Sequence, residues 1–180
     1  YKKIIYCSSS TVYGNQGKKP FSENMPTFAN DVYSIAKLEN EERVLCSGGV
    51  VARFSNVIGN GMSKNNVLSD ILIQLSGRDL LKIRNVNPIQ DFISVDDAVD
   101  AIVSLLKNDI SGIYNIGSGV GTSINKLIGL VLSASGQDDR EIKSTIKNPG
   151  FSYSVLNIEQ IKKITGWTPK YTLSLIHIWR

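Results

Sequence analysis

Two residues of a predicted helix have the types and the spacing for proton transfer. Tyr33 and Lys37 are four positions apart, so a helix places both side chains on one face, about one turn from each other. A nearby ammonium group favours the phenolate form of a tyrosine, which can then accept a proton from a hydroxyl group. Alone, this spacing is a weak signal and is more typical of a solvated lysine one turn from a half-buried tyrosine.

Hydroxyl side chains lie a short way before this pair. The segment CSSSTVYG, residues 7–14, contains Ser8, Ser9, Ser10 and Thr11 and follows an apolar run. If that run is a strand beside the helix, one of these hydroxyls can bond the same substrate oxygen as Tyr33. The pattern therefore predicts acid–base chemistry on a hydroxyl group.

The surrounding elements alternate between strands and helices. Apolar runs predict strands at 2–9, 49–54, 80–83, 89–93 and 112–116. Helical spacing predicts helices at 67–76, 95–106, 122–134 and 157–165, and a further helix that Asn30 or Asp31 caps and that runs to about residue 46. Residues 10–30 carry Gly and Pro at intervals that forbid a long element. The first strand, helix and strand form a β-α-β unit with parallel strands. We expect an α/β fold, with a smaller lobe after residue 56.

Composition excludes several classes of function. The chain has 180 residues, of which 42% are hydrophobic and 20% charged, which is typical of globular proteins. Its net charge of +4 comes from scattered basic residues, so no nucleic-acid partner is expected. Apolar runs are too short for a membrane span. His177 is the single histidine, and Cys7 and Cys46 form no ligand motif, so neither a metal site nor a Ser-His-Asp triad is expected. Two isolated cysteines indicate a cytoplasmic protein.

Several motifs resemble one enzyme family in their order and spacing. They are SSSTVYG, YSIAK, ARFSNVIG, PIQDFISVDDAVDAI, GIYNIGSG and ITGWTPKYTL. Together they resemble the extended short-chain dehydrogenase/reductase family, in its nucleotide-sugar epimerase and dehydratase branch. The resemblance runs from residue 1 to about residue 173. It implies the C-terminal part of a Rossmann-like, doubly wound parallel sheet with a smaller substrate-binding lobe.

The resemblance implies a role for each candidate residue. Ser9 would contact the reacting hydroxyl, Tyr33 would transfer its proton, and Lys37 would bond the nicotinamide ribose and favour the Tyr33 phenolate. Phe54 would lie near the nicotinamide, and core packing at a strand end is an equally good explanation of it. Asn56 would bond the phosphate or the sugar of the substrate, with a role in a loop turn as the alternative.

The two positions after Ser9 narrow the class of reaction that we expect. In many dehydratases of the family they are acidic, because expulsion of water needs an acid and a base. Here Ser10 and Thr11 can only contact the substrate, so an epimerase or a ketone reductase is expected.

Two other differences from the family's pattern concern the residues that would bind the diphosphate of the substrate. Gln90, which we expect to contact the substrate, and Asn148 stand where the family has arginines that bind a diphosphate. Loss of two planar cationic groups weakens such binding unless neighbours replace them. Arg84, Lys143 and Lys147 are the candidates.

We expect the chain to be part of a longer protein, since Tyr1 lies inside a predicted strand. Residues 1–56 would be the second half of the dinucleotide-binding domain, with the catalytic motif, and 57–172 mostly the substrate lobe with some returning Rossmann elements. The family's glycine-rich loop would precede residue 1, so NAD is the expected cofactor and NADP stays open. Residues 173–180 look like a translated library adapter and are expected to be non-native.

Three functions follow from these patterns. The first is an NAD(P)-dependent epimerase of a nucleotide-activated sugar, which works by reversible hydride transfer with Tyr33 as acid and base. The second is a nucleotide-4-ketosugar reductase with the same residues. The third is a non-catalytic NAD(P)-binding sensor whose substrate site has decayed. The resemblance also implies a homodimer. As a fragment, the chain would expose an apolar sheet edge and is not expected to fold readily alone.

Overall fold

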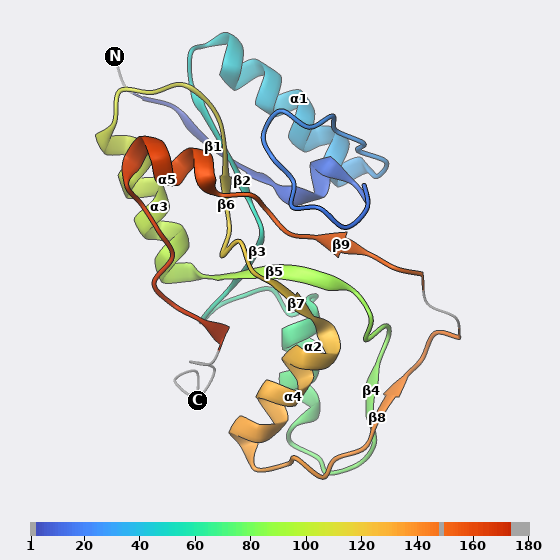
Figure 1. Cartoon of the computed structure of the whole chain (residues 1–180). Coiled ribbons are helices and arrows are strands. Elements are labelled where there is room, and N and C mark those ends of the chain that lie inside the picture. The colour runs from blue at the N-terminus through green and yellow to red at the C-terminus, as the bar shows by residue number, and fades with distance from the viewer. Residues whose placement is uncertain (1–2, 148–149, 174–180) are drawn as a thin grey trace.

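A three-stranded parallel sheet carries the strand that ends in serines. In the computed structural model, which describes residues 3–147 and 150–173, the order of this sheet is β1-β2-β6. Its strands are β1 (Ile5–Ser9), β2 (Val50–Phe54) and β6 (Gly112–Ile116). Both pairings are parallel, which confirms the expected α/β, Rossmann-like class. Among the described strands of this sheet, β1 and β6 are at the two edges and β2 lies between them (Figure 1).

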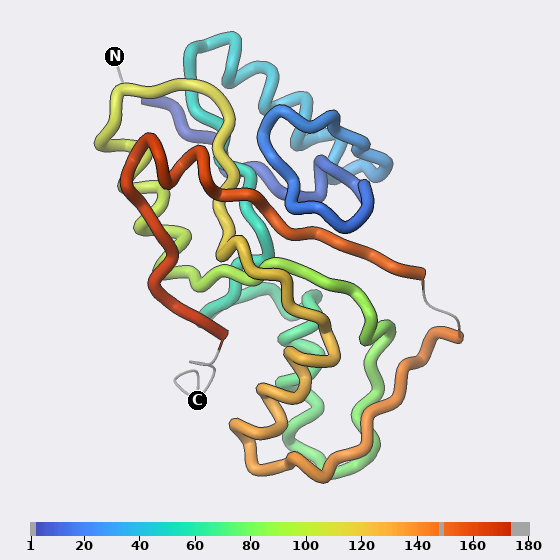
Figure 2. Tube along the Cα trace, in the orientation of Figure 1, coloured from blue at the N-terminus to red at the C-terminus, as the bar shows by residue number. Residues whose placement is uncertain are grey.

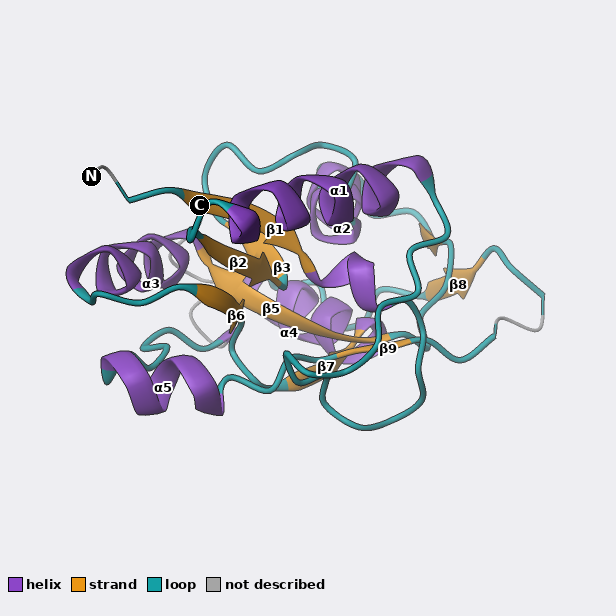
Figure 3. Cartoon of the chain, turned by 90° about the horizontal axis from the view of Figure 1, so that it is seen from above, coloured by secondary structure: helices purple, strands orange, loops and turns teal. Residues whose placement is uncertain are grey.

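Helices cover both faces of this sheet. α1 packs on one face, and α3 and α5 lie on the other (Figure 3). The helices are α1 (Val32–Cys46), α3 (Val95–Lys107) and α5 (Glu159–Thr165). Side chains alternate along β2. Val50, Ala52 and Phe54 therefore join the core beneath α3 and α5, whereas Arg53 bonds a residue of α1.

A second lobe is built around a mixed sheet. In it, β5 pairs in parallel with β3 and β9 and antiparallel with β7. These strands are β3 (Asn56–Ile58), β5 (Ile89–Ser94), β7 (Gly121–Ser123) and β9 (Tyr153–Ser154). A separate parallel pair, β4 and β8, packs with α2 and α4 around a second apolar core. Their bounds are β4 (Leu81–Ile83), β8 (Ile142–Ser144), α2 (Val67–Gln74) and α4 (Ile124–Ser135).

The chain passes more than once between the two lobes. The trace in Figure 2 leaves the first sheet after β2, returns through β5 and α3 to β6, and leaves again for α4. It comes back once more through β9 to α5. Elements after residue 56 thus contribute to the first sheet, and the division of domains at that residue stays a prediction.

The sequence patterns located the long elements and missed most of the short ones. α1 begins after Asp31, as predicted, because the Asp31 side chain accepts a hydrogen bond from the backbone N–H of Ser34. The segment expected to be irregular contains a short 3-10 helix, η1 (Ser10–Tyr13). Strands β3, β7, β8 and β9 were not predicted. They have two or three residues each, and only partners far away in the sequence define them.

A buried carboxylate joins the two lobes. Asp91 of β5 is fully buried and accepts hydrogen bonds from the backbone N–H groups of Ser118 (2.8 Å), Gly119 (3.0 Å) and Leu156 (3.3 Å). The Ser118 hydroxyl donates a fourth bond at 2.6 Å. Burial raises the pKa of Asp91, and these donors act in the opposite direction by favouring its charged form. One side chain thereby connects β5 to the turn after β6 and to the segment before α5.

Replacement of Asp91 by alanine should destabilise the protein strongly. The change leaves the buried N–H of Leu156 and the part-buried N–H groups of Ser118 and Gly119 without their acceptor. An unsatisfied buried group costs about 1–3 kcal/mol and a part-buried one less, so we expect a total loss of about 3 kcal/mol. Urea unfolding of the full-length protein measures it. Asp138→Ala, at an exposed aspartate, is the control. An equally small loss in both variants would contradict the connecting role.

Candidate active site

Tyr33 lies where the carboxyl ends of the parallel strands open. Because α1 joins two parallel strands, it runs opposite to them, and its first turn lies beside the end of β1. The start of the helix is fixed by Asp31, whose pKa is lowered by the hydrogen bond from the Ser34 backbone. In open α/β sheets, ligands bind outside this edge. The Tyr33 side chain is 55% exposed there, so a ligand can reach it.

Lys37 connects the helix to β1. Its Nζ donates a hydrogen bond of 2.8 Å to the backbone carbonyl of Cys7. The same ammonium lies 5.5 Å from the centre of the Tyr33 ring and 5.0 Å from that of Tyr6. Both distances are typical of a cation held by aromatic rings. The structure therefore brings Lys37 next to Tyr33 and onto the strand that ends at Ser9.

Ser9 ends β1 and caps η1. Its Oγ accepts hydrogen bonds from the backbone N–H (3.3 Å) and the hydroxyl (3.0 Å) of Thr11. It donates to none of the residues that the structure describes, so its own proton is available for a ligand oxygen. Thr11 is exposed beside it, whereas Ser10 is buried, with its hydroxyl 3.5 Å from that of Ser154. The three expected hydroxyls thus differ in access, and a substrate contact of Ser10 stays a prediction.

The other two residues expected near the ligand are held by their neighbours. Phe54 is 9% exposed and belongs to the core under α3, as the packing alternative predicted, and its contact with a nicotinamide stays a prediction. The Asn56 side chain donates a hydrogen bond of 3.0 Å to the carbonyl of Asp91. Asn56 is exposed and shares with Gln90 a pocket of about 430 Å³.

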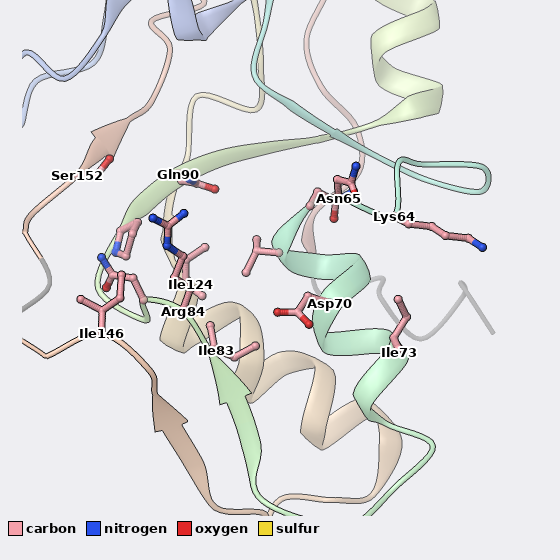
Figure 4. A pocket seen from close by; sticks show the side chains of 14 residues that line it. Lys64, Asn65, Asp70, Ile73, Ile83, Arg84, Gln90, Ile124, Ile146 and Ser152 are labelled. Atoms are coloured by element: carbon pink, nitrogen blue, oxygen red, sulfur yellow. The ribbon is translucent and has the colours of Figure 1, made fainter. Parts of the chain in front are cut away.

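A larger pocket lies between α2, β4 and β5 (Figure 4). Its volume is about 840 Å³, and Gln90 and Arg84 line it together with Lys64 and Asn65. Figure 4 shows the guanidinium of Arg84 on the side of the pocket where Gln90 lies. No hydrogen bond or ion pair joins this guanidinium to another residue in the described ranges, so it can bind an anion.

Only one of the three cations expected to replace the missing arginines lines this pocket. Arg84 does, and Lys143 and Lys147 are not among its described lining residues. Asn148, the other departure from the family pattern, lies outside the described residues, as do His177 and positions 174–180 of the suspected tail. The sequence could not select Arg84, because the choice depends on how β4 packs beside β5.

Gly14 is a structural residue of the site that the sequence patterns did not single out. It ends η1 with a φ of 66° and a ψ of −155°, a conformation open almost only to glycine. A Cβ at this position would lie 2.8 Å from the carbonyl oxygen of Phe28. The Phe28 N–H in turn donates to the Val12 carbonyl at 3.0 Å. The loop is thus packed directly on the turn that follows Ser9.

Fold and site together define a short-chain dehydrogenase/reductase of the extended type: a parallel sheet, a serine at a strand end, and a Tyr-Lys pair on the next helix. More closely, the chain belongs to the NAD dependent epimerase/dehydratase family, whose model matches residues 1–117. This match confirms the family resemblance drawn from the motifs.

Known proteins of this family resemble the chain along nearly its whole length. UDP-glucose 4-epimerase 3 of Oryza sativa is 29% identical over 202 residues, which cover 94% of this chain and 54% of that protein. Among solved structures, RMD from Pseudomonas aeruginosa complexed with NADPH has a TM-score of 0.88 at 25% identity, over 94% of this chain and 62% of that one. UDP-glucose 4-epimerase from Thermotoga maritima with UDP-glucose has a TM-score of 0.85 at 26% identity, over 99% and 63%. The chain therefore spans about half the length of the curated relatives it matches.

No described helix is long and apolar enough to cross a membrane. Within residues 3–147 and 150–173, no three His, Cys, Asp or Glu side chains are grouped as metal ligands would be. Cys7 and Cys46 are free and exposed.

Gly14→Ala should destabilise the protein more than an alanine at an ordinary left-handed glycine. The strained backbone alone costs about 1–3 kcal/mol, and the contact with Phe28 adds to it. Gly136→Ala is the matched control, because Gly136 also has a φ of 66° and open space around it. Thermal unfolding of the two variants compares them. Equal losses would show that the packing of the loop on the turn is unimportant.

Proposed function

We propose that the full-length protein is an NAD(P)-dependent epimerase of a nucleotide-activated sugar. The observation that carries this proposal is the position of Lys37, which bonds the Cys7 carbonyl and lies beside the exposed ring of Tyr33. Ser9, two residues after Cys7, has a hydroxyl proton to donate at the same sheet edge. Two relatives named UDP-glucose 4-epimerase match 94% and 99% of this chain, and this similarity supports the same reaction.

Residues of this chain would carry out the proton transfer of the reaction. The substrate's carbinol would lose its hydroxyl proton to Tyr33 while Ser9 donates a hydrogen bond to the same oxygen. A bound nicotinamide would supply the acceptor for the hydride from carbon and later its return. Tyr33 would then give the proton back to the ketone oxygen after the sugar has presented its other face. The positive charge of Lys37 would favour the phenolate that this cycle needs.

The residues of this chain fit a nicotinamide cofactor at the sheet edge. After its bond to Cys7, the Lys37 ammonium has two N–H groups left, which can hold ribose hydroxyls. Tyr33 stands open beside it, and Phe54 ends the neighbouring strand β2. Tyr33, Lys37 and Phe54 are accordingly our candidates for cofactor contacts, with NAD preferred and NADP open.

The pocket beside Arg84 would hold the nucleotide end of the substrate. Gln90 is uncharged, so the guanidinium of Arg84 would bind the diphosphate in place of the family's arginine. The N-terminus of α2, capped by Asn66, faces the same pocket and adds N–H donors for an anion. Ile83 and Ile124 give the pocket an apolar wall suited to a planar base. Ser9, Thr11 and Asn56 would contact the sugar.

Ser9, Tyr33 and Lys37 would serve a reductase equally well. The use of cofactor distinguishes the two reactions. An epimerase returns the hydride and consumes no cofactor, whereas a reductase uses one NAD(P)H for each product. Ser10 and Thr11 offer no carboxyl group, which disfavours dehydration. A homodimer and a cytoplasmic location also stay predictions.

Tyr33→Phe tests the proposal. Loss of the general acid and base should lower kcat for nucleotide-sugar epimerisation by about 10²- to 10⁴-fold, with little change in KM. Tyr171→Phe, at another exposed tyrosine, is the control and should keep full activity. If Tyr33→Phe keeps the parental epimerase activity, Tyr33 is not the acid and base, and the proposed mechanism fails. If the parent protein converts no nucleotide sugar and Tyr33→Phe keeps its biological effect, the protein is a sensor on the same fold and the epimerase proposal fails.

Arg84→Met tests the anchor of the nucleotide. A hydrogen bond to a charged group contributes about 1.5–3 kcal/mol, so the Kd for UDP should rise roughly 10- to 100-fold. Titration calorimetry on the full-length protein measures it, and Gln90→Arg should strengthen binding. Arg78→Met removes an exposed arginine outside this pocket and controls for net charge. Unchanged binding in Arg84→Met would exclude this anchor.

A further inference from the structure

A buried ion pair lies directly beneath the helix of the candidate active site. Glu41 of α1 and Arg53 of β2 are each 3% exposed. Arg53 Nη2 lies 2.6 Å from Glu41 Oε2, and Nε lies 3.1 and 3.2 Å from the two carboxylate oxygens. Removing two charges from water costs about as much as their attraction returns, so such a pair contributes little net stability. Its place in the fold suggests another role.

The pair also holds the strand that leads to Ser9. The Ser8 hydroxyl donates a hydrogen bond of 2.5 Å to Glu41 Oε1. Ser8 and Arg53 are register partners on the neighbouring parallel strands β1 and β2 and therefore lie on one face of the sheet. Glu41 thus bonds the residue next to Ser9 and its neighbour on β2 at the same time.

The same network reaches the turn that Ser9 caps. The guanidinium of Arg53 lies 4.8 Å from the centre of the Tyr13 ring. The Tyr13 hydroxyl donates to Asn115 Oδ1 at 2.8 Å, and Asn115 is the register partner of Arg53 on β6. Tyr13 is the last residue of η1. Ser8, Arg53 and Asn115 therefore form a polar row across three strands, and Tyr13 covers it.

Glu41 is placed so that it fixes the helix as well. It follows Lys37 by four residues and Tyr33 by eight, which puts the three on one side of α1. With a rise of about 1.5 Å per residue, Glu41 lies about 6 Å along the axis from Lys37 and about 12 Å from Tyr33. Its carboxylate bonds one residue on each of the two strands beneath the helix, Ser8 and Arg53, and these bonds oppose sliding or turning of α1 on β1.

We propose that Glu41 and Arg53 are positioning residues of the proposed reaction, which hold Tyr33 and Lys37 in register with Ser9. Among the described residues, the side-chain hydrogen bonds between α1 and the strands β1 and β2 are that of Lys37 to the Cys7 carbonyl and those of Glu41 with Ser8 and Arg53. The inference rests on the proposed function and adds to it the part of the fold that aligns the reacting residues.

The test distinguishes an effect on the alignment of Tyr33 and Lys37 with Ser9 from an effect on the stability of the protein. In the full-length protein, Glu41→Leu with Arg53→Met replaces the pair by apolar side chains of similar size, a change that often leaves stability equal or higher. We expect a cooperative melt like that of the parent, an unchanged KM, and a kcat at least tenfold lower. Glu42→Leu, at the exposed neighbouring glutamate, is the control and should keep the parental kcat. A folded double variant with the parental kcat would overturn the proposal.

A second variant covers the case in which the double variant does not fold. Arg53→Lys keeps the positive charge but cannot bond both carboxylate oxygens as a planar fork. We expect it to fold and to lose kcat severalfold without a change in KM. A parental kcat in this variant would also overturn the proposal.

A third readout does not require turnover. If the parent protein converts no nucleotide sugar, the proposed function fails, and crystal structures of parent and Arg53→Lys still test the alignment. The hydrogen bond from Lys37 to the Cys7 carbonyl should be present in the parent and broken in the variant. An intact bond in both would contradict the positioning role.

Discussion

The direction and register of α1 on the parallel strands is the constraint on which the rest of the site depends. Because β1 and β2 are parallel, the helix between them runs antiparallel and delivers Tyr33 to the edge at which Ser9 ends β1. Lys37 then reaches the Cys7 carbonyl from the next turn. One turn further, Glu41 accepts bonds from both neighbouring strands. The spacing of Tyr33 and Lys37, their place at this edge of the sheet and the buried polar contacts of Glu41 are consequences of this single crossover.

The parts of this arrangement that the sequence could predict are local ones. The cap at Asp31 and the helical periodicity after it place α1 to within a residue or two, and the spacing of Tyr33 and Lys37 then fixes their common face. Strand β6 follows from its own apolar run. The family motifs added the roles of individual residues, which no periodicity contains.

The rest could not be predicted, because it depends on residues that are far apart in sequence. From sequence alone, a glutamate in the middle of a helix is normally interpreted as a solvent-exposed charge. Only the pairing of β1 with β2, which places Ser8 beside Arg53, shows that Glu41 is buried against Arg53. Likewise, Ser9, Ser10 and Thr11 all carry a hydroxyl group, and their different exposure depends on the η1 turn, which the sequence patterns did not predict. The selection of Arg84 over Lys143 and Lys147 also arises from packing, through the position of β4 beside the pocket.

Deuterium at the carbon that is inverted gives the most direct test of the central claim. Full-length protein would be incubated with UDP-glucose deuterated at C4, or with another nucleotide sugar that it converts, and the product followed by NMR. The account predicts an inverted product that retains its deuterium without net use of cofactor, since Tyr33 exchanges only the hydroxyl proton and the hydride returns to the same carbon. Loss of deuterium to water, or consumption of one NAD(P)H for each product, would contradict it.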